Sequence, residues 1–446
     1  MKKFLSFFLA VIIIITSLYI VSFATSESFA GITYAQTPTD SSALLFSKKF
    51  GGNYKGAPTP PVVVGDTIIL VSGVKLYKLD AKTGEEIASV KMQGSTLYAT
   101  VAPFYADGKI FVQLDEGIVQ AFDYETMTSL WVYTDSLGGQ AICPITYDGE
   151  YIYTGFWVSE TEYANYVCLS VKDENTKKQT ESKKAKWTYK SLGGFYWAGC
   201  LVTDDYIVFG KDDGKSGSSG SSKIIALNKS SGKSVSTLSV KGDIRSSVTY
   251  SSETNSCYVS SKAGYVYKFN INSSTGKLSS LKTYTAAGAV TGTPVVYNER
   301  LYVGCANGSK GEFIVLNAST MKEIYSCEML GYPQATMLVS AGYEDTNGKI
   351  YIYSTYNSKP GGITVFEDSA GQKEAIKTEL FTPDENMSEY CISTISASED
   401  GTLYYKNDSG NIFAVSKKMS ISSFLQKIFA FLSELLSKLK ALFAQI

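Results

Sequence analysis

The sequence predicts an all-β protein: an eight-bladed β-propeller closed by an N-terminal strand, with a C-terminal amphipathic α-helix. Short β-type runs separated by tight polar turns recur every 40–50 residues, the period of a four-stranded propeller blade. The 38 glycines and 32 tyrosines, against only 10 prolines, are typical of a turn-rich β protein. Six units are led by Pro61, Pro103, Pro144, Cys200, Ser247 and Pro294, at steps of 42, 41, 56, 47 and 47 residues.

Residues 1–35 are predicted to be a signal peptide or an N-terminal membrane anchor. Two lysines follow the initiating methionine and precede an apolar run from Phe4 to Phe23, the pattern of a secretory signal. A small residue at Ala30 or Ala35 could precede a cleavage site, but the run is also long enough to span a bilayer. We expect an extracytoplasmic protein, secreted or attached to the outer face of the cytoplasmic membrane.

Residues 44–415 are predicted to form the propeller. Eight units are present, and the last, residues 391–415, has only three strands. The spare strand Leu44–Phe50 is expected to complete it, which joins the two ends of the ring and removes an open sheet edge. Two polar stretches inside units, Lys172–Lys186 and Lys211–Ser222, are predicted to be mobile solvated loops.

Residues 416–446 are predicted to form the C-terminal helix. From Ile421 to Ile446, apolar residues recur at three- and four-residue steps, with Lys, Ser and Glu on the other side. The phenylalanines and lysines suit a helix that lies on a membrane surface through residues 420–446. Packing on the propeller or against a second copy is the alternative.

The composition excludes several classes of function. The chain has no histidine, which rules out Ser-His-Asp and Cys-His catalysis, imidazole zinc sites and histidine-ligated haem. Forty-one basic and 42 acidic residues give a formal charge of −1, so no nucleic-acid partner is expected. The seven cysteines are odd in number and irregularly spaced, and they are predicted to be buried free thiols. No metal site is predicted, and because no cysteine precedes Cys143 the chain is not expected to be a lipoprotein.

The turn between the third and fourth strands of several units resembles a known motif. It is the tryptophan-docking motif, Ala-x-Asp-x-x-Thr-Gly-Lys-x-x-Trp, of pyrroloquinoline-quinone (PQQ)-repeat propellers. Physically, a short Asp or Asn binds turn amides, glycine takes a positive φ, and the aromatic ring packs between blades. The first unit departs from the motif at Ala88, which replaces the tryptophan, and the second at Met127, which replaces the glycine. The matching residues are Asp80, Thr83 and Gly84 in the first unit, Ala121, Asp123, Thr126 and Trp131 in the second, and Asn317 and Thr320 in the sixth.

The resemblance implies two kinds of function. The catalytic members are quinone-dependent alcohol dehydrogenases, which share a disulfide between adjacent cysteines, a calcium held by acidic and amide side chains, and a catalytic Asp. This chain has no adjacent cysteine pair and no obvious calcium loop, so neither PQQ nor calcium is predicted. The closer non-catalytic member assists outer-membrane protein assembly in Gram-negative bacteria and is a lipoprotein. The missing lipobox argues against that specific role, and the bias of lysine over arginine suggests a Gram-positive source.

A propeller places the connections into its innermost strands around one mouth of the central channel, where a ligand surface is expected. Tyrosine, tryptophan and amide side chains in that position suit the stacking of sugars or the binding of a peptide. Filling of the channel entrance by the same aromatics is the alternative. The predicted binding residues are Tyr98, Gln140, Tyr196, Trp197, Arg245, Gln334 and Tyr390.

These observations favour a non-catalytic, secreted or cell-surface PQQ-like propeller that acts as a scaffold or binding module. Its expected partners are proteins or envelope polysaccharide, with a membrane surface as a further partner of the C-terminal helix. A PQQ-dependent oxidoreductase and a carbohydrate-active enzyme are the alternatives. The second would need two carboxylates facing one cleft, and only Glu389 and Asp243 lie near the expected mouth. No catalytic residue is predicted.

Overall fold

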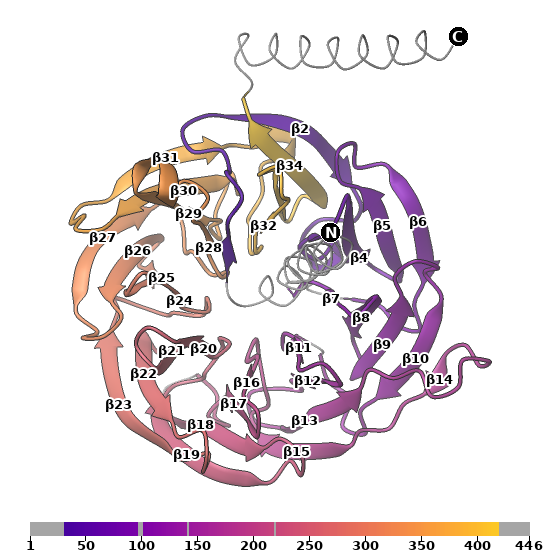
Figure 1. Ribbon diagram of the computed structural model, residues 1–446. Helices are drawn as coiled ribbons and strands as arrows, with labels where there is room; N and C mark the ends of the chain where they lie inside the picture. Colours follow the sequence, from indigo (N-terminus) through magenta and orange to yellow (C-terminus); the bar gives the residue numbers. More distant parts are fainter. Residues whose placement is uncertain (1–30, 97–100, 141, 218–219, 419–446) are drawn as a thin grey trace, which may run out of the picture.

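The computed structural model describes residues 31–96, 101–140, 142–217 and 220–418. Eight β-sheets stand around a central channel in these ranges, which confirms the predicted eight-bladed propeller (Figure 1). Residues 1–30, Tyr98 and nearly all of the predicted C-terminal helix lie outside the described residues. The described part of the chain has no helix long and apolar enough to cross a bilayer.

Each of the first four blades has four antiparallel strands, ordered from the channel outward. Blade 1 has β3 (Val62–Val64), β4 (Thr67–Ser72), β5 (Lys75–Asp80) and β6 (Glu86–Lys91), and blade 2 has β7 (Phe104–Ala106), β8 (Lys109–Leu114), β9 (Ile118–Asp123) and β10 (Ser129–Thr134). Blade 3 has β11 (Thr146–Tyr147), β12 (Tyr151–Gly155), β13 (Tyr163–Ser170) and β15 (Trp187–Leu192), and blade 4 has β16 (Leu201–Val202), β17 (Tyr206–Gly210), β18 (Ser221–Asn228) and β19 (Ser234–Lys241).

Blades 5 to 8 repeat this order, with short helical turns η1 (Tyr54–Gly56), α3 (Glu344–Asn347) and η2 (Glu385–Met387) in the connections. Blade 5 has β20 (Thr249–Ser251), β21 (Ser256–Ser261), β22 (Tyr265–Ile271) and β23 (Leu278–Thr285), and blade 6 has β24 (Val295–Tyr297), β25 (Arg300–Asn307), β26 (Lys310–Asn317) and β27 (Glu323–Met329). Blade 7 has β28 (Leu338–Ser340), β29 (Lys349–Ser354), β30 (Ile363–Ser369) and β31 (Ile376–Phe381), and blade 8 has β32 (Ser396–Ala397), β33 (Leu403–Lys406), β34 (Asn411–Lys417) and β2 (Ser42–Lys49).

Strand β2 closes the ring, as the sequence predicts. It forms the outer strand of blade 8 by antiparallel pairing with β34, and Figure 1 shows the indigo β2 beside the yellow β34. The side chain of Phe46 points into the core between blades 8 and 1, where it is 9% exposed. The two ends of the propeller are therefore joined by backbone hydrogen bonds and by an apolar side chain, and the described sheets leave no unpaired edge at this junction.

Two short strands extend the predicted architecture. Strand β1 (Ile32–Thr33) pairs in parallel with the innermost strand β28, and the Ser340 hydroxyl donates to the Ala35 carbonyl at 2.7 Å. Strand β14 (Glu181–Ser182) pairs in parallel with the outer strand β10. The expectation of a mobile solvated loop over Lys172–Lys186 is thus wrong for its second half, because Lys183 is buried with its Nζ 5.3 Å from the centre of the Trp131 ring.

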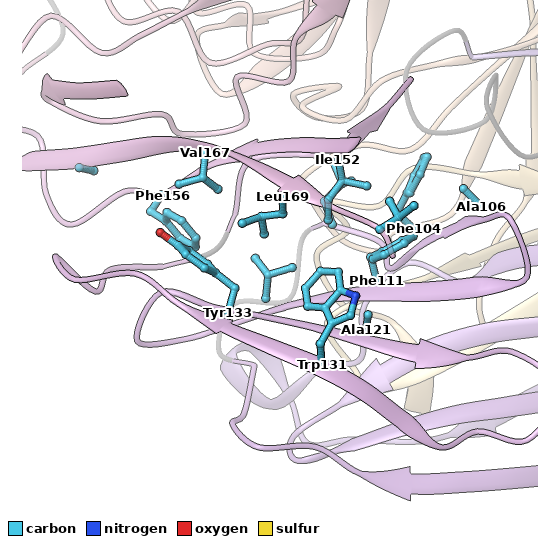
Figure 2. Packing of buried hydrophobic residues seen from close by; sticks show 14 residues of the cluster. Phe104, Ala106, Phe111, Ala121, Trp131, Tyr133, Ile152, Phe156, Val167 and Leu169 are labelled. Atoms are coloured by element: carbon cyan, nitrogen blue, oxygen red, sulfur yellow. The ribbon is translucent and has the colours of Figure 1, made fainter. Parts of the chain in front are cut away.

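The core lies between neighbouring blades, because each sheet buries both faces against the next. Figure 2 shows one such cluster, in which Trp131 and Phe111 of blade 2 pack against Ile152 and Leu169 of blade 3. The Trp131 side chain is completely buried. Six of the seven cysteines are buried, and all seven are free thiols, in line with the sequence-based expectation.

The motif turns have the predicted geometry. In blade 1 the Asp80 carboxylate accepts hydrogen bonds from the amide of Lys82 at 2.9 Å and from the amide and hydroxyl of Thr83 at 2.8 and 3.0 Å. Thr126 binds Asp123 in the same way in blade 2, as Thr320 binds Asn317 in blade 6. Hydrogen bonds from Thr83 lower the pKa of Asp80. Hydrogen bonds from Thr126 likewise lower the pKa of Asp123, although burial acts in the opposite direction.

Aromatic side chains of one blade pack on the glycine of the next motif turn. The Trp187 indole of blade 3 donates to the Lys229 carbonyl of blade 4 at 2.9 Å, and a Cβ atom added to Gly232 would lie 2.6 Å from its ring. Phe46 makes the equivalent contact across the ring closure, where a Cβ atom on Gly84 would also lie 2.6 Å from the phenyl ring. The closing strand therefore carries an aromatic residue in the tryptophan position.

Candidate functional site

A cavity of about 910 Å³, counting its part open to solvent, lies in the central channel. Its lining residues come from the beginnings of the innermost strands, or from the connections just before them, in all eight blades. Figure 1 shows these strands arranged around the channel. Apolar, aromatic, hydroxyl and amide side chains line the cavity, and none of its described lining residues is charged.

Hydrogen bonds between blades hold the innermost strands in place around the cavity. The Thr146 hydroxyl of blade 3 donates to the Cys200 carbonyl just before blade 4, at 2.9 Å. The Thr249 hydroxyl of blade 5 donates to the Pro294 carbonyl at 2.8 Å, and the Ser396 hydroxyl of blade 8 reaches the Pro61 carbonyl at 2.5 Å. Each bond ties one blade to the next, so the width of the channel is set by the ring as a whole.

Two of the predicted binding residues, Trp197 before blade 4 and Gln334 before blade 7, line the cavity. Trp197 is half-buried and has a φ of 55°, a left-handed conformation that costs a non-glycine residue about 1–3 kcal/mol. Its ring meets the Tyr196 ring edge-on, with centroids 4.8 Å apart. The side-chain oxygen of Gln334 accepts a hydrogen bond from the Asn357 amide at 2.9 Å, which fixes the orientation of the Gln334 amide.

Arg245 lies beneath this surface and does not line the cavity. It is 7% exposed, and its guanidinium donates to both carboxylate oxygens of Asp212, with the shortest distance 2.7 Å. Further ion pairs join it to Glu160 at 3.2 Å and to Asp243 at 3.4 Å. The guanidinium carbon lies 4.4 Å from the centre of the Tyr196 ring. Arg245 therefore supports the Tyr196–Trp197 segment from below.

The charges of this cluster influence one another strongly. Burial raises the pKa of Asp212 to about 7; the hydrogen bonds and charge of Arg245 partly offset this effect, and the Asp243 carboxylate adds to it. Burial also opposes the charge of Glu160, but the Gly217 amide and Lys262 outweigh it and lower the pKa of Glu160. Asp212 is consequently a buried carboxyl whose protonation changes near neutral pH.

The other predicted binding residues lie in different surroundings. Gln140 forms a two-way backbone bridge with Trp157, at 2.8 and 3.0 Å. Tyr390 is 49% exposed and its carbonyl accepts from the Asp408 amide, but it does not line the cavity. Tyr98 lies outside the described residues.

The sequence-based search missed the hydroxyl-bearing residues of the cavity wall. Ser247, Thr291 and Thr336 each lie a few residues before an innermost strand and line the cavity. Ser247 stands where other units have their leading proline, so its place in the repeat was the available signal. A search restricted to aromatic and amide side chains could not find these residues.

Comparison with known proteins decides the family. A family model described as outer membrane protein assembly factor BamB matches residues 41–160 and 187–421. The chain belongs to this family. The BamB-like match covers most of the propeller and confirms the resemblance that the motif turns indicate. No match is found among curated proteins.

Solved structures share the fold of this BamB-like chain at low sequence identity. BamB from Moraxella catarrhalis superposes with a TM-score of 0.54 at 13% identity, over 84% of this chain and 99% of that one. Quinohemoprotein alcohol dehydrogenase from Comamonas testosteroni superposes with a TM-score of 0.64 at 12% identity, over 90% of this chain and 82% of that one. The computationally designed protein Ika8 superposes with a TM-score of 0.54 at 11% identity, over 83% and 98%. At such identities the likeness concerns the fold alone.

The residues present in the channel do not fit the quinone and calcium of the catalytic relatives. PQQ carries carboxylates, which need cationic partners when they leave water, and the described cavity wall offers none. The described residues also hold no group of three or more Cys, Asp or Glu side chains that could bind a metal ion. The chemistry of the channel wall is suited to holding an uncharged group.

Proposed function

We propose that this BamB-like propeller is a non-catalytic binding module outside the cytoplasm, and that it holds its partner at the mouth of the central channel. The observation that carries the proposal is the cavity wall, which combines Trp197, an oriented Gln334 amide and several hydroxyls with no charged side chain among its described residues. Such a wall offers apolar area and directed hydrogen bonds, the usual composition of a ligand pocket.

The acidic residues near the mouth argue against glycoside hydrolysis, which needs two carboxyl groups facing the substrate. Asp212 and Asp243 are completely buried and pair with Arg245. Glu160 pairs with Arg245 and Lys262, and Glu389 with Lys359 at 3.0 Å. Each acid has a structural partner, and the two buried ones cannot reach a substrate without local unfolding.

The extracytoplasmic location rests on the predicted signal or anchor in residues 1–35, and attachment to a membrane surface rests on residues 420–446. Protein and envelope polysaccharide are both compatible with the neutral wall. Protein binding is the more general expectation, since the family description names an assembly factor.

A substitution that fills the cavity tests whether the mouth is the binding surface. Ala335 lines the cavity, and Ala335→Trp would occupy part of it without removing a polar group. We expect the full-length wild type to bind at least one of two immobilised uncharged probes: chitohexaose or an uncharged extended dodecapeptide. Binding measured by surface plasmon resonance should fall at least about tenfold in Ala335→Trp.

Tyr390→Ala is the matched control, because Tyr390 is an exposed aromatic near the mouth that does not line the cavity. It should bind as the wild type does, and both variants should keep the wild-type circular dichroism spectrum. If a folded Ala335→Trp variant binds every probe as well as the wild type, or if the wild type binds none, the proposed binding surface is wrong.

A further inference from the structure

We propose that the channel cavity is a binding site for an unbranched, uncharged oligosaccharide, with Trp197 as the stacking surface and Ser247 and Gln334 as hydrogen-bonding groups. The inference rests on the proposed function and names the chemical class of ligand for the same site. Three independent observations carry it: the absence of charge in the described wall, the supported conformation of Trp197, and a buried hydroxyl of the wall that has no partner.

The charged groups beneath the cavity wall pair with one another and do not line the cavity. The guanidinium of Arg245 forms ion pairs with Asp212, Asp243 and Glu160. An anionic polymer would therefore lose its hydration in the cavity without gaining an ion pair, and a cationic group would do the same. The described wall thus selects against charged ligands and favours those that carry hydroxyl and amide groups.

Trp197 is held as a rigid aromatic surface at the cavity wall. Its backbone adopts a φ of 55°, and the loop before it contains Gly193 and Gly194, whose φ values of 85° and 67° are also positive. Tyr196 contacts the Trp197 ring edge-on and itself lies over the Arg245 guanidinium. A side chain supported in this way loses little conformational entropy when it binds, which suits stacking on the apolar face of a sugar ring.

Ser247 supplies a polar group that the protein alone leaves unsatisfied. Its side chain is completely buried and borders the cavity, and its hydroxyl has no hydrogen-bond partner among the described residues. A buried hydroxyl without a partner costs about 1–3 kcal/mol, which a ligand with both donors and acceptors would recover. Gln334 adds an amide NH₂ group, because its oxygen is already bound to Asn357 and no described residue accepts from its nitrogen.

An uncharged peptide is the other class of ligand that a neutral wall could admit. A peptide that binds by adding a strand needs an exposed strand edge. The innermost strands are only two or three residues long, and the edge of β28 is already paired with β1. These short edges offer few backbone groups to a peptide, whereas side-chain hydroxyls, an amide and an indole line the cavity.

The test is isothermal titration calorimetry of the full-length chain with chitohexaose, cellohexaose and maltohexaose. We expect saturable binding of at least one of them. Trp197→Ala should weaken it at least about tenfold, as loss of a stacking aromatic generally does, and Tyr390→Ala should leave it unchanged. Ser247→Ala should weaken binding about fivefold while leaving the melting temperature equal or higher, because it removes an unsatisfied buried hydroxyl. If Ser247 had only a structural role, the substitution would lower both the affinity and the melting temperature.

Each of the other outcomes overturns the inference. Absence of binding to all three oligosaccharides does so, as does equal binding by folded Trp197→Ala. If the uncharged dodecapeptide binds and Ala335→Trp abolishes that binding while the oligosaccharides do not bind, the saccharide assignment fails but the proposed function stands. If nothing binds in a manner sensitive to Ala335→Trp, both fail.

Discussion

At the scale of single residues, the channel mouth depends on the contact between Arg245 and Asp212. The pair is buried and lies under Tyr196, so its geometry determines where the Tyr196–Trp197 segment stands. Replacing such an ion pair by apolar residues can be neutral, but removing one partner leaves the other charge buried. The Arg245–Asp212 pair therefore affects binding by positioning Tyr196 and Trp197, and not by contacting a ligand.

The raised pKa of Asp212 makes stability depend on pH. Its pKa is about 7 in the folded chain, against the ordinary 3.8 of an exposed carboxyl, chiefly because of burial. The folded chain holds a proton that the unfolded chain releases between these values, so the contribution of Asp212 to stability falls as the pH rises through that window. Between pH ~5.5 and ~8 we expect the wild type to lose about 2 kcal/mol that Asp212→Asn does not lose.

Denaturant unfolding of both proteins at the two pH values measures this difference. The carboxyls whose pKa is lowered, Asp80 and Asp123 among them, titrate at lower pH and do not contribute in this range. Parallel pH dependence in wild type and Asp212→Asn would contradict the raised pKa of Asp212.

Single residues also show where sequence reasoning succeeds and where it stops. The expectation that Trp197 and Gln334 lie at the channel rested on the repeat register, which is a local property of the chain, and the structure places both in the cavity wall. Arg245 was expected at the surface, but its burial depends on Asp212 and Glu160, which are 33 and 85 residues away in sequence. Pairing over such distances leaves no local pattern.

At the scale of elements, the motif turns determine how blades join. The bonds between Asp80 and Thr83 close within three residues, which is why a sequence motif predicts them. Strands β1 and β14 are different, because each has two residues and pairs in parallel with a distant strand. Their formation depends on the assembled blade, so alternation of apolar and polar residues could not reveal them.

Two glycines of blade 1 separate backbone strain from packing: Gly65, in the turn between β3 and β4, and Gly84, in the motif turn between β5 and β6. Gly65 and Gly84 both have positive φ values, of 57° and 69°, but a Cβ atom on Gly65 would meet nothing within 4 Å whereas one on Gly84 would strike Phe46. We expect Gly65→Ala to lower the free energy of unfolding by about 1–2 kcal/mol through strain alone. Gly84→Ala should lower it by a further ~1–3 kcal/mol through overpacking. Equal losses in urea titrations would contradict the tight contact across the ring closure.

The closing strand offers a second test. Phe46 and Leu45 are neighbours in β2, but Phe46 is 9% exposed and Leu45 is 49% exposed. We expect Phe46→Ala to destabilise the protein by about 3–5 kcal/mol, because it leaves a cavity between blades 8 and 1. Leu45→Ala should change stability by less than about 0.5 kcal/mol. Similar effects of the two substitutions on thermal unfolding would mean that β2 does not hold the ring closed.

At the scale of the whole molecule, the eight blades form one closed ring whose cores are shielded from solvent. The buried thiols report on this closure, because only Cys327 of the seven cysteines is partly exposed. Burial raises the pKa of Cys143 and Cys391 to about 12, which keeps these thiols protonated and unreactive. We expect Ellman's reagent to titrate at most one thiol in the native protein and seven in denaturant. Rapid reaction of several thiols in the native protein would indicate an open ring.

The central claim is that the channel mouth binds an uncharged ligand. Hydrogen–deuterium exchange of the full-length chain tests it most directly, measured without ligand and with each of chitohexaose, cellohexaose and maltohexaose. The cavity wall combines segments from several blades, so a bound ligand should slow amide exchange at widely separated places in the sequence. We predict added protection in residues 195–198, 245–248, 291–294 and 334–337, and none in the outer strands β6, β19 and β23. Protection confined to outer strands, or no protection at saturating oligosaccharide, would contradict the claim.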